Sequence, residues 1–280
     1  MAVISLSTGS LYTYGIARVF ELAAEAGFDA IEVLADHRWD SRQPAYLRRL
    51  SQEAGLPIVA IHSPFDVLPT PGWPRDPLGR LQESAALARE VGAGVVVAHL
   101  PFRIRAVRVE VLGGRHRSLL LPLPLSGERD YLDFLLNGLV EFEAEEGVRV
   151  GVENMPAKRF LGRRVSIYAL NNVESLAGFA HLTLDTTHLG TWGLDPLAVY
   201  EELKPRIVHV HLSNFDGEEH RLLEDGHLSL GELLHRLSQD GYAGAVSVEV
   251  KPDALQAEDG AQVLAHLRRA VHFCRQHSAR

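Results

Sequence analysis

The sequence predicts an α/β protein folded as a (β/α)8 TIM barrel, with residues 1–280 forming one domain. Short β-branched runs alternate with amphipathic helical stretches along the whole chain. Eight such strand–helix pairs fit into 280 residues, which is the usual size of this barrel. An open doubly wound sheet would give the same alternation, but no Gly-x-Gly-x-x-Gly motif follows the first predicted strand. The closed barrel is therefore favoured.

The elements follow from hydrophobic period and from the turns between them. Runs rich in Val and Ile predict strands at 3–7, 30–34, 58–62, 95–99, 149–153, 181–185, 207–212 and 245–250. Apolar residues at helical spacing predict helices at 15–26, 45–54, 78–91, 131–146, 173–179, 197–203, 230–239 and 261–276. Gly27, Gly55 and Gly241 stand where a helix should end before the next strand, because glycine tolerates the left-handed conformation of a helix C-terminus.

One segment, 101–128, breaks this rhythm and is too long for an ordinary loop after a strand. Its arginines alternate with Val and Leu, at Arg103, Arg105, Arg108, Arg115 and Arg117. Alternation around Gly113 and Gly114 predicts a small hairpin over the C-terminal mouth of the barrel, where loops carry specificity. A solvated excursion or a contact between copies in a homo-oligomer is an equally open interpretation.

Composition narrows the class of protein. The formal net charge of −8 gives no indication of nucleic-acid or anionic-membrane binding. The single cysteine, Cys274, excludes an internal disulfide and a thiolate metal cluster, and it suits a reducing cytoplasm. We expect this cysteine to be a small buried hydrophobic residue. The N-terminus lacks a signal-peptide pattern, and no apolar run approaches the roughly 20 residues of a membrane span, so a soluble cytoplasmic protein is expected.

Four successive predicted strands end on a metal-binding side chain: Glu153, Asp185, His211 and Glu249. Side chains alternate direction along a strand, and the last inward residue of a barrel strand lies at the mouth. Carboxylates brought this close repel each other unless a cation lies between them. Three carboxylates and one imidazole suit a divalent metal, Zn²⁺ or Mn²⁺ first and Mg²⁺ or Co²⁺ as alternatives.

Further donors stand around these four residues. His62 and His99 end the third and fourth strands, and His188 lies three residues after Asp185. Glu218 and His220 follow the seventh strand. These donors are either structural or sufficient for two or three ions in all, so between one and three metals are expected.

Other polar and aromatic residues have alternative interpretations. His209 also faces inward, and we expect it to be a hydrogen-bonded core histidine. Glu32 ends the second strand and is a candidate for substrate binding or for supporting the site, since a buried carboxylate needs a partner. Trp192 is a candidate to stack on a sugar ring, or it simply packs at the rim.

Five short motifs resemble those of a known family: His62-Ser63-Pro64, Val152-Glu153-Asn154, Leu184-Asp185-Thr186-Thr187-His188, His209-Val210-His211-Leu212, and Glu249 closing the eighth strand. The chain resembles the xylose isomerase-like TIM barrels over nearly its whole length. That group includes sugar isomerases, ketose 3-epimerases, inosose-processing enzymes and endonuclease IV.

The resemblance implies a metal-dependent isomerase or epimerase whose partner is a small carbohydrate, either a sugar, a sugar phosphate or a polyol ketone. Ketose epimerases hold one metal with residues matching Glu153, Asp185, His211 and Glu249. The two glutamates then exchange the proton of the substrate carbon through an enediolate. His188 and Lys251 would contact the substrate. Those epimerases have an arginine shortly after the strand-seven histidine, where this chain has Gly217 and Glu218.

The alternative is an endonuclease IV-like phosphodiesterase with a multinuclear zinc site, and nucleic acid is a partner only under this hypothesis. Its nine ligands match His62, His99, Glu153, Asp185, His188, His211, Glu218, His220 and Glu249, with Glu218 standing where that family has Asp. A clear equivalent of the family's DNA-intercalating loop is missing from the sequence. A third hypothesis is a retained barrel that binds a sugar without turning it over.

Overall fold

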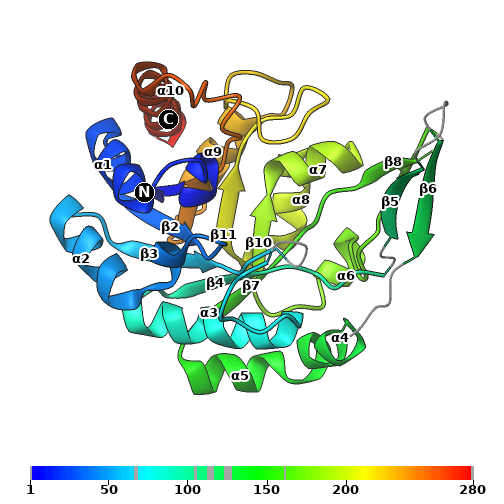
Figure 1. Ribbon diagram of the computed structural model, residues 1–280. Coiled ribbons are helices and arrows are strands. Elements are labelled where there is room, and N and C mark those ends of the chain that lie inside the picture. The colour runs from blue at the N-terminus through cyan, green and yellow to red at the C-terminus, as the bar shows by residue number, and fades with distance from the viewer. Residues whose placement is uncertain are drawn as a thin grey trace.

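Eight parallel strands close into a barrel in the computed structural model, which describes residues 2–65, 69–103, 106–111, 117–122, 128–160 and 162–278 (Figure 1). Around the barrel the strand order is β1-β12-β11-β10-β7-β4-β3-β2. The strands are β1 (Val3–Ser7), β2 (Ala30–Leu34), β3 (Ile58–His62), β4 (Val95–Ala98), β7 (Arg149–Glu153), β10 (Leu182–Asp185), β11 (Ile207–Leu212) and β12 (Ala245–Val248). The predicted (β/α)8 fold is confirmed.

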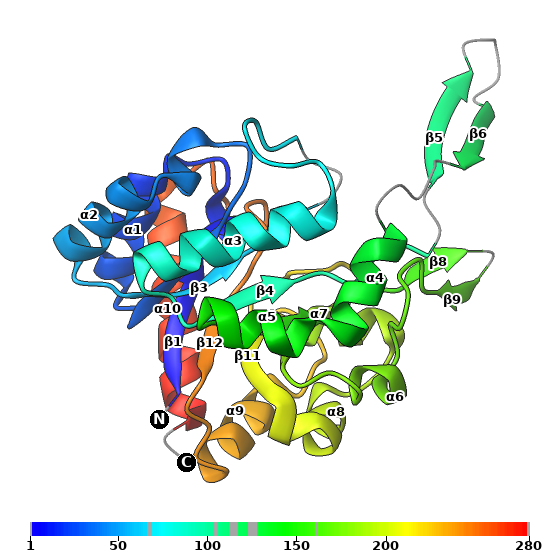
Figure 2. The same ribbon diagram turned by 90° about the horizontal axis from the view of Figure 1, so that it is seen from below.

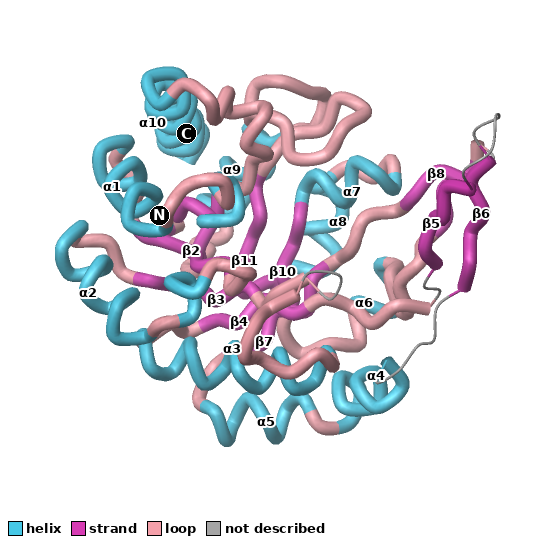
Figure 3. Tube along the Cα trace, viewed as in Figure 1, coloured by secondary structure: helices cyan, strands magenta, loops and turns pink. Residues whose placement is uncertain are grey.

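Helices surround the strands on the outside (Figure 3). They are α1 (Ile16–Ala26), α2 (Pro44–Ala54), α3 (Pro77–Val91), α4 (Glu128–Asn137), α5 (Leu139–Glu146), α6 (Val173–Leu176), α7 (Thr186–Trp192), α8 (Pro196–Leu203), α9 (Leu230–Gln239) and α10 (Gly260–Ser278). Short 3-10 helices lie at Thr8–Leu11, Trp39–Arg42 and Lys204–Arg206. Within the described residues, no helix combines the length and apolar character needed to cross a membrane.

Helices α4, α5 and α7 differ most from the prediction. The single helix predicted over 131–146 is two helices, α4 and α5, which meet at Gly138. Glycine weakens a helix interior, and here it is the N-cap of α5. Helix α7 was not predicted, and it begins directly after β10 because the Asp185 side chain accepts a hydrogen bond from the His188 backbone N–H.

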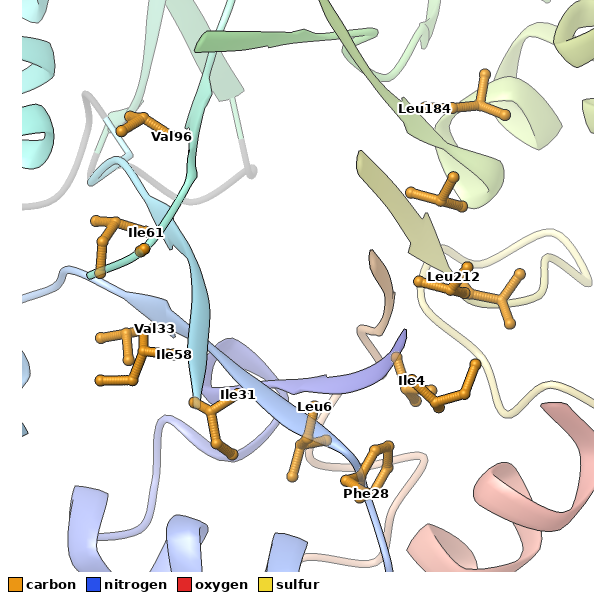
Figure 4. Packing of buried hydrophobic residues seen from close by; sticks show 14 of the residues in the cluster. Ile4, Leu6, Phe28, Ile31, Val33, Ile58, Ile61, Val96, Leu184 and Leu212 are labelled. Atoms are coloured by element: carbon orange, nitrogen blue, oxygen red, sulfur yellow. The ribbon is translucent and has the colours of Figure 1, made fainter. Parts of the chain in front are cut away.

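The core has two layers separated by the strands. Side chains such as Ile31, Ile61 and Leu184 point from the strands toward the surrounding helices (Figure 4). Inside the barrel, Ala60, Val95 and Val208 form a separate small apolar cluster. The inward positions above that cluster carry polar side chains, so the C-terminal end of the barrel interior is available for a site.

The predicted helix-ending glycines have the expected conformation. Gly27 and Gly55 follow α1 and α2 with φ of 89° and 67°, in the left-handed region. Their backbone N–H groups donate to carbonyls of the preceding helical turn. These contacts end each helix one or two residues before the next segment turns toward the barrel.

Two small antiparallel hairpins extend from the barrel. One pairs β5 (Ala106–Val111) with β6 (Arg117–Pro122), so the predicted hairpin within 101–128 is present. It projects away from the barrel in Figures 1 and 2, and its role over the mouth stays a prediction. The predicted turn residues 113–114 lie outside the described residues. The other hairpin, β8 (Lys158–Phe160) with β9 (Arg163–Val165), was not predicted.

We expect Cys274 to resist alkylation in the folded protein. Its side chain is fully buried, and burial raises the pKa of the thiol to about 12. At about pH 8 the reactive thiolate fraction is then about 1 in 10,000, against roughly a quarter for an ordinary cysteine. Mass spectrometry after iodoacetamide treatment should show unmodified native protein and complete labelling in guanidinium. Equal labelling rates in both conditions would contradict the buried placement.

Candidate metal centre

Four buried donors converge at the C-terminal end of the barrel interior. They are His62 at the end of β3, Glu153 at the end of β7, His211 on β11, and Glu249 directly after β12. One potential ligand atom from each lies within 4.8 Å of those of the other three. Parallel strands bring their final inward residues to one level, which is why residues so far apart in the sequence meet here.

A second group, formed by Asp185, His188 and His220, lies beside the first, again with ligand atoms within 4.8 Å of one another. His188 joins the two groups, because its Nδ1 is 3.6 Å from both Glu153 Oε1 and Asp185 Oδ2. The turn from β10 into α7 places His188 back over the strand end. His220 has a φ of 59°, which is rare for a residue with a side chain and is often found at functional sites.

In three of these histidines, a hydrogen bond determines which ring nitrogen carries the lone pair. Each Nδ1 faces a backbone carbonyl: His62 to Ser63 at 2.9 Å, His188 to Asn154 at 2.8 Å, and His220 to Glu249 at 3.2 Å. A carbonyl oxygen can only accept, so Nδ1 carries the proton and the lone pair is on Nε2. Metal-binding histidines are commonly oriented in this way.

In His211 the roles of the two ring nitrogens are exchanged. Its Nε2 lies 3.0 Å from Glu32 Oε2, and its Nδ1 lies 2.9 Å from Glu153 Oε1 and 3.1 Å from Glu249 Oε2. Asp185 Oδ2 is 3.7 Å from the same Nδ1. Three carboxylates therefore surround one imidazole nitrogen.

Electrostatics show an excess of buried negative charge. Burial, together with the charges of Glu32 and Glu153, holds the pKa of Glu249 well above its usual value, although His211 opposes this. Burial by itself would lower the pKa of His211, but the carboxylates of Glu32 and Glu249 outweigh it and keep that pKa well above normal. Burial also disfavours the Glu153 carboxylate, yet the hydrogen bond and charge of His211 hold its pKa well below normal. Without a bound cation, His211 and Glu249 therefore tend to keep their protons.

Several buried polar atoms in the cluster have no hydrogen-bond partner among the described residues: Glu153 Oε2, Asp185 Oδ2 and His99 Nε2. Such atoms are costly unless something satisfies them. Burial, with a smaller contribution from His62, lowers the pKa of His99 to about 3, so the imidazole is neutral and able to act as a ligand. Oxygen and imidazole donors around surplus negative charge fit a divalent cation.

Of three further residues with expected substrate-binding roles, one lines the cavity and two do not. Lys251 lines the cavity above the cluster. The Trp192 indole is half-buried and donates to the Met155 carbonyl at 2.8 Å, and the side chain of Glu32 is buried beneath His211. Neither Trp192 nor Glu32 lines the cavity.

Glu218 is not brought together with the other eight expected ligands. Its side chain is 71% exposed, and its carboxylate lies 3.6 Å from Arg221. Its neighbour Glu219 lines the cavity instead and lies 3.5 Å from the Lys158 ammonium. The sequence shows two adjacent glutamates without distinguishing them, because the loop conformation decides which one faces inward.

A cavity of about 510 Å³ opens above the cluster and is within the usual range for small-molecule sites. Its wall includes residues that the sequence did not single out, namely Tyr12, Asp36, His37, Phe65 and Tyr168. Gly9 also lines it, and a Cβ there would lie 3.2 Å from Ser7 Oγ and 3.4 Å from Glu249 Oε1. Glycine at this position therefore leaves room beside the Glu249 carboxylate.

Known proteins are similar to this chain in sequence or in fold. Uncharacterized protein Rv0498 of Mycobacterium tuberculosis is 26% identical over 299 residues, covering 99% of this chain and 98% of the relative. The 3-keto-D-glucoside 4-epimerase of E. coli has a TM-score of 0.68 at 19% identity, with 99% and 100% of the two chains covered. A D-psicose 3-epimerase determined in the presence of D-fructose has a TM-score of 0.66 at 16% identity, with 98% of each chain covered.

At these identities the two solved structures establish a shared fold and nothing more specific. The family itself is shown by sequence, because residues 20–268 match the model of the xylose isomerase-like TIM barrel family. That span contains all the buried donors described above. The chain belongs to the xylose isomerase-like TIM barrel family.

Proposed function

We propose that this protein is a metal-dependent isomerase or epimerase that acts on a sugar, a sugar phosphate or a related polyol ketone. The observation that carries the proposal is the meeting of Glu153 and Glu249 at His211 Nδ1, with Glu249 also lining the cavity of about 510 Å³. Two carboxylates beside one small-molecule cavity suit the removal and return of a proton on a substrate carbon. The shared fold with sugar epimerases supports the same class of reaction.

The metal would be held by Glu153, Asp185, His211 and Glu249, with His62 and His99 as further neutral donors. When bound, a divalent ion would polarise the carbonyl and neighbouring hydroxyl of the sugar, which acidifies the adjacent C–H. Zn²⁺ and Mn²⁺ fit the nitrogen and oxygen donors best.

In the metal-free protein the two glutamates differ in pKa. The hydrogen bond and charge of His211 outweigh the effect of burial and hold the pKa of Glu153 well below normal. Burial, with the charges of neighbouring carboxylates, holds the pKa of Glu249 well above normal, and a bound metal would displace its proton. Both carboxylates could then exchange a proton with the substrate carbon from positions beside the metal. His188 and Lys251 line the same cavity and would orient the hydroxyl groups of the substrate.

A direct test is hydrogen exchange into ketose sugars and their phosphates. In deuterated buffer with Mn²⁺, we expect the protein to place one deuterium on the carbon whose configuration or oxidation level changes, detected by NMR of the recovered sugar. Glu249→Gln should lower this exchange by about 100-fold or more, since a positioned acid or base typically contributes that much.

The matched control is Glu258→Gln, which changes an exposed carboxylate outside the cavity and should leave exchange unchanged. The panel includes D-fructose, D-tagatose and D-psicose with their phosphates. Failure to exchange with every member of the panel, by protein carrying its full metal content, would argue against the proposal. Equal exchange by wild type and Glu249→Gln would remove Glu249 from the reaction.

A second candidate, an endonuclease IV-like phosphodiesterase, is favoured by one specific observation. Asp185, His188 and His220 form a second donor group next to the first, which is enough for more than one zinc ion. The hairpin of β8 and β9 adds four exposed cations, at Lys158, Arg159, Arg163 and Arg164. Elemental analysis separates the candidates, because about three zinc ions per chain with nicking of abasic-site plasmid would support the nuclease. One ion per chain without nicking would exclude it.

A further inference from the structure

A buried carboxylate supports the metal centre from below. We propose that Glu32 is a positioning residue that fixes the ring orientation and tautomer of His211, and so prepares Nδ1 as a metal ligand. The inference rests on the metal site of the proposed function. Glu32 is fully buried and does not line the cavity, so it acts through His211 and not on the substrate.

The hydrogen-bond geometry decides which nitrogen of His211 is free. Glu32 Oε2 lies 3.0 Å from His211 Nε2. An ionised carboxylate can only accept hydrogen bonds, so Nε2 must carry the proton in this contact. The lone pair of the neutral imidazole is then on Nδ1, which faces Glu153 and Glu249. His62, His188 and His220 present Nε2 instead, and His211 is the ligand whose orientation depends on a carboxylate.

A second histidine holds the carboxylate itself. His209 Nε2 also hydrogen-bonds to Glu32 Oε2, and the ring of His209 stands at 89° to that of His211 with centroids 5.2 Å apart. The other oxygen, Oε1, has no hydrogen-bond partner among the described residues. The two imidazoles therefore determine the orientation of the Glu32 carboxylate, and His209 stabilises the contact between Glu32 and His211.

Strand β2 places the Glu32 side chain inside the barrel, facing His211. Its neighbours Ile31 and Val33 point outward into the helix-facing core, so alternation turns Glu32 inward (Figure 4). The pairing of β2 with β3 shifts register between Ile31 and Glu32. The extra residue is Val59 of β3, so β2 keeps its alternation through Glu32. The contact joins residues 179 positions apart in the chain.

The test measures metal binding and does not depend on a substrate. Glu32→Gln keeps the side-chain size but replaces the accept-only carboxylate, and we expect the affinity for Mn²⁺ to fall about 10- to 100-fold in isothermal titration calorimetry. Glu143→Gln is the matched control, because Glu143 is also a buried carboxylate bound to a histidine, with its Oε1 2.7 Å from His181 Nδ1, but it lies on helix α5 outside the barrel. Its affinity for Mn²⁺ should equal that of the wild type.

Glu32→Asp separates positioning from simple charge attraction. This variant retains the negative charge but is one methylene shorter, so it cannot reach His211 Nε2 in the same geometry. Positioning predicts that Glu32→Asp weakens Mn²⁺ binding about as much as Glu32→Gln. Charge attraction alone predicts that Glu32→Asp retains wild-type affinity, and that result would overturn the proposal.

NMR on the wild type tests the same point without any substitution. In Zn²⁺-loaded protein with ¹⁵N-labelled histidine, His211 should carry its proton on Nε2. A proton on Nδ1 of His211 would overturn the proposal even if both variants failed to fold. Failure of the wild type to bind Mn²⁺ or Zn²⁺ would refute the metal site itself, whereas normal binding by wild type and by folded Glu32 variants would refute only the role of Glu32.

Discussion

Glu153→Gln is expected to lower the affinity of the protein for divalent metal by more than about 100-fold, beyond the loss typical of an outer-sphere change. Glu153 contributes to the first donor group, lies 2.9 Å from His211, and has one buried oxygen without a partner among the described residues. The amide replaces an anionic ligand with a neutral one of the same shape. The metal therefore loses both a charge and a strong donor, while the packing around the side chain is preserved.

Elemental analysis after gel filtration and calorimetric titration with Mn²⁺ measure this loss. Asp36→Asn is a suitable control, because Asp36 is another buried carboxylate of the same cavity, but its charge is paired with Arg38 at 2.7 Å. That variant should bind metal as the wild type does. Full metal content in folded Glu153→Gln would show that the metal centre lies elsewhere.

Metal removal is expected to lower the midpoint of thermal unfolding by about 10 °C near neutral pH. A ligand present at about 1,000 times its dissociation constant stabilises the folded state by about 4 kcal/mol. For a chain of this size each kcal/mol corresponds to roughly 2–4 °C. Differential scanning calorimetry with and without EDTA measures the difference. An unchanged midpoint would contradict tight binding to the folded protein.

The effect of metal removal should also grow as pH rises above about 6.5, the ordinary pKa of histidine. In the metal-free protein, His211 and Glu249 have pKa values held well above normal by surrounding carboxylates and by burial, respectively. A raised pKa in the folded state contributes stability that is complete below the unfolded-state pKa and is lost as pH rises through the folded-state value. The metal replaces those protons, so the loaded protein avoids this loss.

In the acidic range, the pH dependence of folding stability has the opposite sign. Burial disfavours the carboxylates of Glu32 and Glu153, but contacts with His211 outweigh it and hold both pKa values well below normal. Their contribution is present above the unfolded-state value of about 4.3 and is lost as pH falls. The metal-free protein should therefore be most stable in mildly acidic buffer. A pH-independent difference between loaded and metal-free protein would contradict this electrostatic account.

Local rules were sufficient for much of the fold. Alternation and β-branched runs predicted the eight barrel strands to within one or two residues at their ends. The same alternation predicted that Glu153, Asp185 and His211 face inward at the strand ends, because parity along a strand is a property of neighbouring residues. The break at Gly138 and the helix α7 were missed, since both depend on contacts at helix ends.

Loop residues and long-range partners required the folded chain. Whether Glu218 or Glu219 faces the cavity depends on the conformation of the loop after β11, which pairs Glu219 with Lys158 on a distant hairpin. The role of Glu32 was open from sequence, because its partners His209 and His211 lie on a strand far along the chain. Neither contact follows from local spacing.

The amino-acid sequence by itself determined the barrel and the inward-facing residues at its strand ends, because both follow from short-range periodicity and from the size of one closed parallel sheet. Only the tertiary structure decided which donors meet, which nitrogen of each histidine is free, and which loop residues line the cavity. Those properties depend on ångström-scale distances between strands and loops that the chain brings together from far apart, as the contact of Glu32 with His211 demonstrates.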